Sequence, residues 1–320
     1  MLVLVIAIVL GLNQLGLLDR SERTLRTVRV SGADPIAAAA SVARTSHGGS
    51  VPTVIIAGTA ALADGVVATG LAGALNAPIL LNEPDRLSAQ TRDVVRELDV
   101  QRAVLIGGTQ ALSEAVSQAL ADELDVEVIR IAGNSRFDTA GQVADLFAES
   151  EEPAVLDGLR TALIVPAEDV PAGLEAGSLA ASLGNPLPVL ISQDGTLPDP
   201  TVRAIERLDI EQLLVVGNLT GYDGAVVRIQ GPNGAADAAI AVRAFRPPRV
   251  VVVPAGDEAR TLIAGPLAGR EAGVILTADL AVEWLTRNCG TVSQLYVIGE
   301  PEVITDLQVA TMENAATNCD

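Results

Sequence analysis

An internal repeat constrains the fold of this 320-residue chain more than any other feature of the sequence. The pattern Arg-x-x-Gly ends a predicted strand at Arg29–Gly32, Arg130–Gly133 and Arg228–Gly231, at intervals of 101 and then 98 residues. An interval of this size is typical of a small domain, and self-similarity at a fixed period indicates tandem units. The sequence therefore predicts three similar units in one chain.

Each repeat continues with the same series of predicted elements. An Ala-rich helix, a buried strand, a small-residue helix, a second buried strand, an amphipathic helix and a third strand follow one another. The predicted strands are Val54–Ile56, Leu163–Val165 and Val250–Val253, then Pro78–Leu81, Pro188–Ile191 and Gly273–Leu276, then the strands that end at Gly107, Gly217 and Gly299. Short apolar strands without alternation, separated by helices, are typical of parallel sheets covered on both faces. We expect an α/β fold with repeats at residues 25–129, 130–227 and 228–320.

The first 18 residues form an uncharged apolar run that ends before Asp19. A helix of this length nearly crosses the hydrocarbon core of a bilayer. We therefore expect residues 1–24 to act as a signal-anchor or export segment, with a buried core helix as the alternative. The expected location is the cell envelope outside the cytoplasm, either membrane-anchored or secreted.

The composition excludes several classes of function. The 21 basic residues are all Arg and His47 is the only histidine, so Walker-type phosphate loops, Schiff-base lysines and two-His metal sites cannot be built. The net charge of −19 and an aromatic content of 2% argue against nucleic-acid binding. We expect no cofactor, no metal site and no catalytic residue, and His47 lies in no catalytic motif.

The chain has two cysteines, Cys289 and Cys319, and they do not form a Cys-x-x-Cys pair. In an exported protein an even number of cysteines indicates a disulfide. The alternative is a pair of buried thiols. We expect the disulfide.

Three segments of the chain resemble the cell-wall-binding repeat type 2 family of bacterial surface proteins. Residues 130–140, RIAGNSRFDTA, are similar to the opening of the family repeat, "R-I-x-G-x-x-R-Y-x-T-A". Ala77–Leu81 match the family's "A-P-I-L-L" strand, and Val104–Thr109 match its "I-I-G-G" turn. The resemblance extends over about residues 29 to 320.

This resemblance implies a fold and a function. It implies three Rossmann-like or Toprim-like units packed around a pseudo-threefold axis, in a module without enzymatic activity. Such modules attach proteins non-covalently to a cell-wall polysaccharide or another envelope glycopolymer, often beside an effector domain. The remaining hypotheses are a small-ligand receptor or enzyme on the same units, and a degenerate structural spacer.

The repeats differ at positions that the family keeps. At the acidic position of the small-residue helix, the three repeats have Asp64, Ala172 and Arg260. The middle repeat is the most acidic, yet only this repeat has the second Arg of the opening motif, Arg136. A polyanionic ligand would therefore depend on local Arg clusters.

Six residues are candidates for ligand binding: Arg130, Arg136, Asp64, Gly107, Gly108 and Thr109. Parallel sheets bind ligands beyond the carboxyl ends of their strands, where Arg130 and Arg136 are predicted, and Arg suits carboxylate or phosphate. The alternative, which we favour, is that both join repeats through ion pairs with acids such as Asp138.

The remaining candidates also have structural interpretations. Asp64 could bind sugar hydroxyls, but capping its own helix is the favoured role. The glycine turn at Gly107, Gly108 and Thr109 could offer amides to an anion, but a tight turn explains the glycines equally well. Trp284 and Tyr296 are isolated and are predicted to be core or rim residues.

Overall fold

The computed structural model describes residues 25–182, 184–231, 233–243 and 246–319. The predicted signal-anchor segment, residues 1–24, lies outside this part of the chain. Within the described residues, no helix combines the length and the apolar character needed to cross a membrane.

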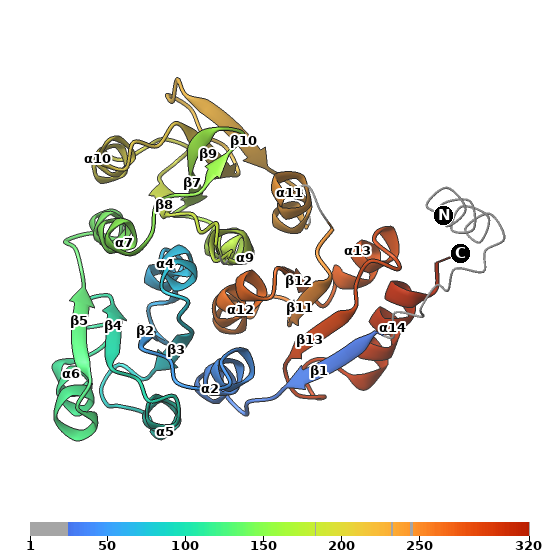
Figure 1. Cartoon of the computed structure of the whole chain (residues 1–320), viewed down its shortest axis with the longest axis horizontal. Coiled ribbons are helices and arrows are strands. Elements are labelled where there is room, and N and C mark those ends of the chain that lie inside the picture. Colours follow the sequence, from blue (N-terminus) through green and yellow to red (C-terminus); the bar gives the residue numbers. More distant parts are fainter. Residues whose placement is uncertain (1–24, 183, 232, 244–245, 320) are drawn as a thin grey trace, which may run out of the picture.

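Three parallel sheets form the framework of the molecule (Figure 1). The first sheet has the order β3-β2-β4-β5, the second has the order β8-β7-β9-β10, and the third has the order β12-β11-β13-β1. A two-residue strand, β6, pairs antiparallel with β7. Their bounds are β1 Arg26–Val30, β2 Thr53–Gly58, β3 Ile79–Asn82, β4 Arg102–Ile106, β5 Glu127–Ile131, β6 Val155–Leu156, β7 Leu159–Pro166, β8 Val189–Ser192, β9 Gln212–Val216, β10 Ala225–Ile229, β11 Arg249–Val253, β12 Val274–Thr277 and β13 Gln294–Ile298. The α/β prediction with parallel sheets is confirmed.

Each Arg-x-x-Gly strand joins the sheet of the preceding repeat. β5, which carries Arg130, pairs with β4, and β10, which carries Arg228, pairs with β9. The first strand of the chain, β1, pairs with β13 near the other end of the sequence. The first strand of each sequence repeat thus belongs to the sheet of the repeat before it. For the first repeat this strand is β1, which completes the third sheet. The division of the chain at 129/130 and 227/228 stays a prediction.

Helices cover the sheets and fill the space between them (Figure 1). Their bounds are α2 Pro35–Ser46, α3 Leu62–Gly65, α4 Ala68–Ala74, α5 Ala89–Glu97, α6 Glu114–Gln118, a π-helical turn at Ala119–Glu123, α7 Arg136–Ser150, α8 Val170–Glu175, α9 Gly177–Ala180, α10 Asp199–Arg207, α11 Gly234–Arg243, α12 Glu258–Arg270, α13 Ala281–Arg287 and α14 Asp306–Thr317. The small-residue helix of each repeat is broken in the first two units, as α3/α4 and α8/α9, and continuous in the third, as α12.

Small residues from the three repeats meet at the centre. A Cβ placed on Gly177 would lie 3.1 Å from the side chain of Thr69 and 3.6 Å from Gly265, the residues at the same repeat position. One turn later, a Cβ on Gly73 would lie 2.7 Å from the backbone of Ala181. Larger side chains here would separate the helices. The pseudo-threefold axis itself stays a prediction.

The core is aliphatic, as the composition requires. The central strands are buried on both faces, and Val54–Ile56 and Val250–Val253 are at most 1% exposed. Three buried aromatic side chains supplement it: Phe147, Tyr296, and Trp284, whose indole N–H donates to Asp237 Oδ1 over 2.9 Å. Trp284 and Tyr296 are buried, as predicted.

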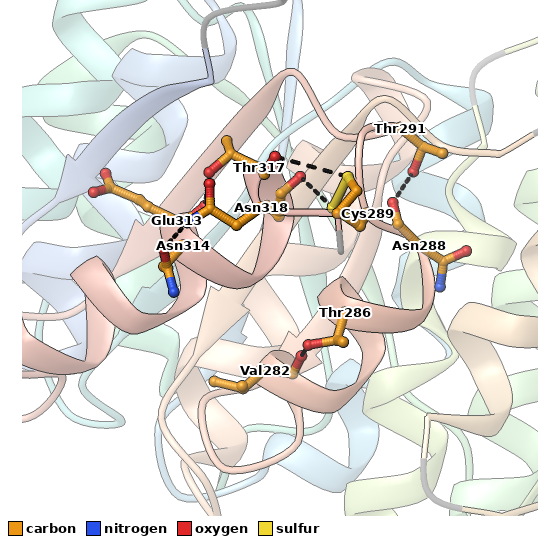
Figure 2. The surroundings of a disulfide bond; sticks show 11 residues. Val282, Thr286, Asn288, Cys289, Thr291, Glu313, Asn314, Thr317 and Asn318 are labelled. Atoms are coloured by element: carbon orange, nitrogen blue, oxygen red, sulfur yellow. Dashed lines mark hydrogen bonds between the residues drawn. A yellow bond between two sulfur atoms is a disulfide. The ribbon is translucent and has the colours of Figure 1, made fainter.

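A disulfide joins Cys289, after α13, to Cys319, after α14 (Figure 2), and confirms the predicted pairing. The Cα atoms lie 5.5 Å apart. The adjacent Gly290 N–H also donates to Ala316 O over 2.9 Å. Because α14 lies against β1, through the Thr27 hydroxyl that donates to Glu313, the bond secures the end of the chain to the third unit.

Candidate functional site

Three equivalent groups of residues lie at the carboxyl ends of the strands, one at each sheet, and we call each group a notch. Each notch is bordered by the start of a small-residue helix and by the glycine turn that follows β4, β9 or β13. The residues after the Arg-x-x-Gly strand of the same sheet, β5, β10 or β1, complete the border. The first notch contains Asp64, Gly107 and Arg136, the second contains Ala172, Gly217 and Gly231, and the third contains Arg260, Gly299 and Gly32. They lie where parallel sheets bind ligands.

Arg130 supports the wall of the first notch. Its guanidinium donates to Gly107 O at 3.2 Å and to Ser117 Oγ at 2.6 Å, and lies 3.5 Å from Glu114. Arg29 donates in the same way to Gly299 O at 2.7 Å. The Arg of the first and second Arg-x-x-Gly strands therefore holds the glycine turn that follows the neighbouring strand. Arg228 instead donates to Leu219 O, two residues beyond the glycine of its turn.

Arg130 does form an ion pair between repeats, but its partner is Glu114 of the first repeat and not Asp138, the acid named as an example. Asp138 does not pair with Arg130; its carboxylate lies 4.0 Å from Arg203 and accepts from the hydroxyl of Ser135, the N-cap residue of α7. The physical reason is direction: Arg130 lies on β5 and reaches back to the first sheet, whereas Asp138 lies on α7, which packs against the second sheet and α10.

Asp64, Gly107 and Arg136 come together in the first notch. A Cβ on Gly107 would lie 3.1 Å from Asp64 Oδ2, and the φ of Gly107 is +100°, so a glycine is required there. Burial raises the pKa of the Asp64 carboxyl, and the nearby Arg136 guanidinium offsets part of this shift. Asp64 does not cap its helix, because α3 begins after Ala61 without a side-chain cap.

Arg136 is the exposed cation of this notch. It is the first residue of α7, and its guanidinium donates to Ala167 O, in the second unit, over 3.1 Å. A shallow hollow, about 250 Å³ with the open solvent above it included, lies beside it, between Ala63 and Val66 of the first unit and Pro166 and Asp169 of the second. An anion or a sugar hydroxyl can reach this guanidinium from solvent.

The Gly107 amide of the glycine turn is not available to an anion. The Gly107 N–H donates to Ile131 O over 2.8 Å, and Gly299 and Gly217 donate to Val30 and Ile229 in the same way. These three amides extend the pairing with the neighbouring strand, so an anion cannot use them. Gly108 and Thr109 follow on the exposed rim of the first notch.

The second notch is the largest of the cavities described here, an open space of about 680 Å³. Asp169 accepts from the Ala172 N–H and caps α8. Glu175, at the end of α8, is half-buried. Burial raises the pKa of Glu175, and the carboxylates of Asp169 and Asp279 raise it further.

The third notch is filled by Arg260. Its guanidinium contacts Asp257 Oδ2 at 2.5 Å and Glu300 Oε2 at 3.4 Å, and donates to Gly32 O over 3.1 Å. The Arg260 side chain is only 9% exposed. Glu300 also accepts from the Gly32 N–H, so this network ties the third unit to the residues after β1.

His47 lies away from the notches. Its Nδ1 is 2.7 Å from Ser46 Oγ and its Nε2 is 3.1 Å from Asn76 O. Burial lowers its pKa, and Arg270 lowers it further, so the imidazole is neutral at neutral pH. Among the described residues, no group of three or more His, Cys, Asp or Glu side chains could hold a metal ion.

Sequence reasoning missed four notch residues: Asp169, Glu175, Asp257 and Glu300. The repeat alignment contains a signal for two of them, because Asp169 and Asp257 occupy the same repeat position, three residues before Ala172 and Arg260. Glu300 directly follows the glycine of its turn, at the position of Gly108. Glu175 has no counterpart in the other repeats.

Comparisons with known proteins agree with this fold. Residues 29–117 match the sequence model of "Cell wall binding domain 2 (CWB2)". Two Clostridium difficile proteins share the fold. Cwp6 superposes with a TM-score of 0.79 at 19% identity, covering 92% of this chain and 48% of Cwp6. Cwp8 superposes with a TM-score of 0.73 at 21% identity, covering 91% and 52%.

Two Bacillus subtilis (strain 168) proteins are related in sequence. The N-acetylmuramoyl-L-alanine amidase LytC is 27% identical over 212 residues, which is 64% of this chain and 40% of LytC. The amidase enhancer is 26% identical over 162 residues, 50% of this chain and 21% of that protein. The chain thus spans less than half the length of these relatives. Residues 29–117 are therefore similar to a cell wall binding domain 2 (CWB2) repeat.

Proposed function

We propose that this chain is a non-catalytic module that attaches to a polysaccharide or another glycopolymer of the cell envelope. The observation that carries the proposal is the match of residues 29–117 to the CWB2 family. The part shared with LytC is then the wall-binding part, and the amidase activity of that protein is not carried over to this chain.

The first notch is the proposed contact with the polymer. Arg136 is exposed and makes a single backbone hydrogen bond, so it can bind an anionic group without breaking an ion pair. Asp64 lies near Arg136 and offers acceptors to sugar groups. Gly108 and Thr109 are exposed after the glycine turn and offer amides and a hydroxyl. Arg130 is a positioning residue that holds the turn.

A sedimentation assay with isolated cell walls tests this proposal. Residues 25–320 should be retained at low salt and released as salt rises, since the contact is partly ionic. Arg136→Gln should weaken retention about tenfold, the equivalent of one charge-assisted contact. Arg203→Gln, which removes an exposed Arg of α10 in the same unit, is the matched control and should bind normally.

Two results would contradict the proposal. Absence of retention at low salt would exclude wall binding. Equal retention of wild type, Arg136→Gln and an Arg130→Gln variant that stays folded would favour a structural spacer. A ligand restricted to the second notch, with no affinity for walls, would instead favour the small-ligand receptor or enzyme.

We also propose an extracytoplasmic location, with attachment to the membrane by residues 1–24. The disulfide supports an oxidising compartment. Immunoblotting of fractionated cells should find the full chain with membranes or walls. A chain found in the cytosol with free thiols would contradict this location.

A further inference from the structure

The three notches differ in whether they supply their own cation. Two repeat positions point towards each notch: one on the small-residue helix, and one at the first residue of the next Ala-rich helix. The residues at these positions are Asp64 and Arg136 in the first notch, Ala172 and Gly234 in the second, and Arg260 and Pro35 in the third. An Arg occupies one position in the first and third notches, whereas the second has Ala and Gly.

The groups around Arg260 in the third notch, which we call the cradle, show what kind of ligand such a notch can bind. Asp257 and Glu300 supply carboxylates, and Gly32 supplies a backbone carbonyl. The group held between them is the guanidinium of Arg260, nearly excluded from solvent. This part of the repeat therefore forms a site for an organic cation, which the third repeat fills with its own side chain.

The second notch keeps the cradle and lacks the side chain. Asp169 stands at the repeat position of Asp257, and Gly231 at the position of Gly32; both border the cavity of about 680 Å³. Asn218 replaces Glu300, but Glu175 adds a carboxylate at the end of α8. The second notch thus retains two carboxylates and two acceptors of neutral charge, the Gly231 carbonyl and the Asn218 amide.

No basic residue lines this hollow. Arg136 borders the adjoining small hollow together with Asp169, and its guanidinium donates to Ala167 O. The nearby Arg228 donates to Leu219 O, beyond the glycine turn. Asp169 and Asp279 both raise the pKa of Glu175, so its charge is disfavoured by its neighbours as well as by burial. A bound cation would relieve this repulsion, in the way that Arg260 does between Asp257 and Glu300.

We propose that the second notch binds a ligand through an ammonium or guanidinium group, in the place that Arg260 occupies in the third notch. Ligands of this class include sugars with a free amine and the basic side chains of peptides. The proposal does not depend on wall binding, because it concerns a different notch and a ligand of opposite charge.

Ligand-observed NMR on the chain from residue 25, with small probes, tests the proposal. D-glucosamine and agmatine represent a sugar ammonium and a guanidinium, and N-acetyl-D-glucosamine is the neutral control. At pH 6 and constant ionic strength, at least one cationic probe should bind saturably and the neutral sugar should not. The stronger probe identifies which source of cation the notch prefers.

Three variants locate the binding. Ala172→Arg places a guanidinium where Arg260 has one and should abolish binding of the cationic probe. Glu175→Gln removes one carboxylate with little change of shape and should weaken binding about tenfold. Glu206→Gln, at an exposed position of α10 in the same unit, should leave binding unchanged.

Several results would overturn the proposal. These are equal binding of charged and neutral sugars, binding that survives both Ala172→Arg and Glu175→Gln, and absence of binding by both cationic probes. If Ala172→Arg fails to fold, the pair Glu175→Gln and Glu206→Gln decides alone. A chain that fails to bind walls but binds the cationic probe would contradict the proposed function and leave this inference intact.

Discussion

The first and third notches contain the same kinds of groups and use them differently. Each has an Arg and a carboxylate at the carboxyl end of a sheet. In the third, Arg260 is 9% exposed and contacts two carboxylates and a backbone carbonyl. In the first, Arg136 is exposed and makes one backbone contact. The buried Arg260 therefore stabilises the module, whereas the exposed Arg136 is available to a ligand.

The largest expected effect comes from removing the buried cation. Arg260→Ala should lower the free energy of unfolding by about 3–5 kcal/mol, because Asp257 and Glu300 lose their buried partner. Urea denaturation measures this change. Arg136→Ala is the matched variant of the exposed notch and should change stability by less than about 0.5 kcal/mol. Equal losses in both variants would remove the distinction between the two notches.

The disulfide tests whether the third unit also depends on a covalent constraint. Cys289→Ser with Cys319→Ser should lower the free energy of unfolding by about 3–4 kcal/mol, from the chain entropy of the opened loop. Thermal unfolding of the wild type with and without reductant should reproduce the loss. Wall retention should persist at temperatures where the variant stays folded, because the first and second notches lie outside the third unit, which contains the disulfide.

Arg130 provides an intermediate case between the two notches. It is partly buried and donates to Gly107 O and Ser117 Oγ. Arg130→Gln should cost about 1–3 kcal/mol of stability, because these acceptors lose a charged donor. The measurement is again urea denaturation, with wall retention tested well below the transition. A variant as stable as wild type that loses retention would make Arg130 a ligand contact.

The smallest effect concerns pH. Burial raises the pKa of Asp64 and of Glu175, so the folded protein binds more protons than the unfolded chain just above the unfolded pKa values. Stability from these groups is therefore full at low pH and is lost as pH rises through the folded pKa values. Glu175→Gln should raise the Tm near pH 7. It should also reduce the decrease of Tm that occurs as the pH rises above about 4–5, the ordinary range for a carboxyl pKa. A steeper fall in the variant would contradict the sign.

The sequence predicted the repeat and the parallel strands, because buried strands and small-residue helices leave a local pattern. It could not predict the offset between repeats and sheets. β1 and β13 are separated by most of the chain, and nothing local to residues 26–30 indicates their partner. The pairing of β4, β9 and β13 with the three Arg-x-x-Gly strands also occupies the Gly107, Gly217 and Gly299 amides, so an anion cannot use these three groups.

The candidate site was only partly visible in the sequence for a similar reason. Asp64 and Arg136 were identified, but they belong to different repeats and meet only because the units pack together. The alignment of Asp64, Ala172 and Arg260 showed a difference in charge. It could not show that Arg260 faces Glu300 or that Ala172 leaves a cavity, since those outcomes depend on residues that the motifs do not include.

The pairing of β1 with β13 has a mechanical consequence. Any tension that reaches the module through the residues before Arg26 enters along β1, whose five residues pair in parallel with Gln294–Ile298. The pull runs along the strand, so the hydrogen bonds of the pair are loaded together in shear instead of opening one after another. The contacts of Arg29 with Gly299 and Asp306 resist the same displacement. A module held through the residues before Arg26 would thus receive its load at β1, the strand that completes the third sheet.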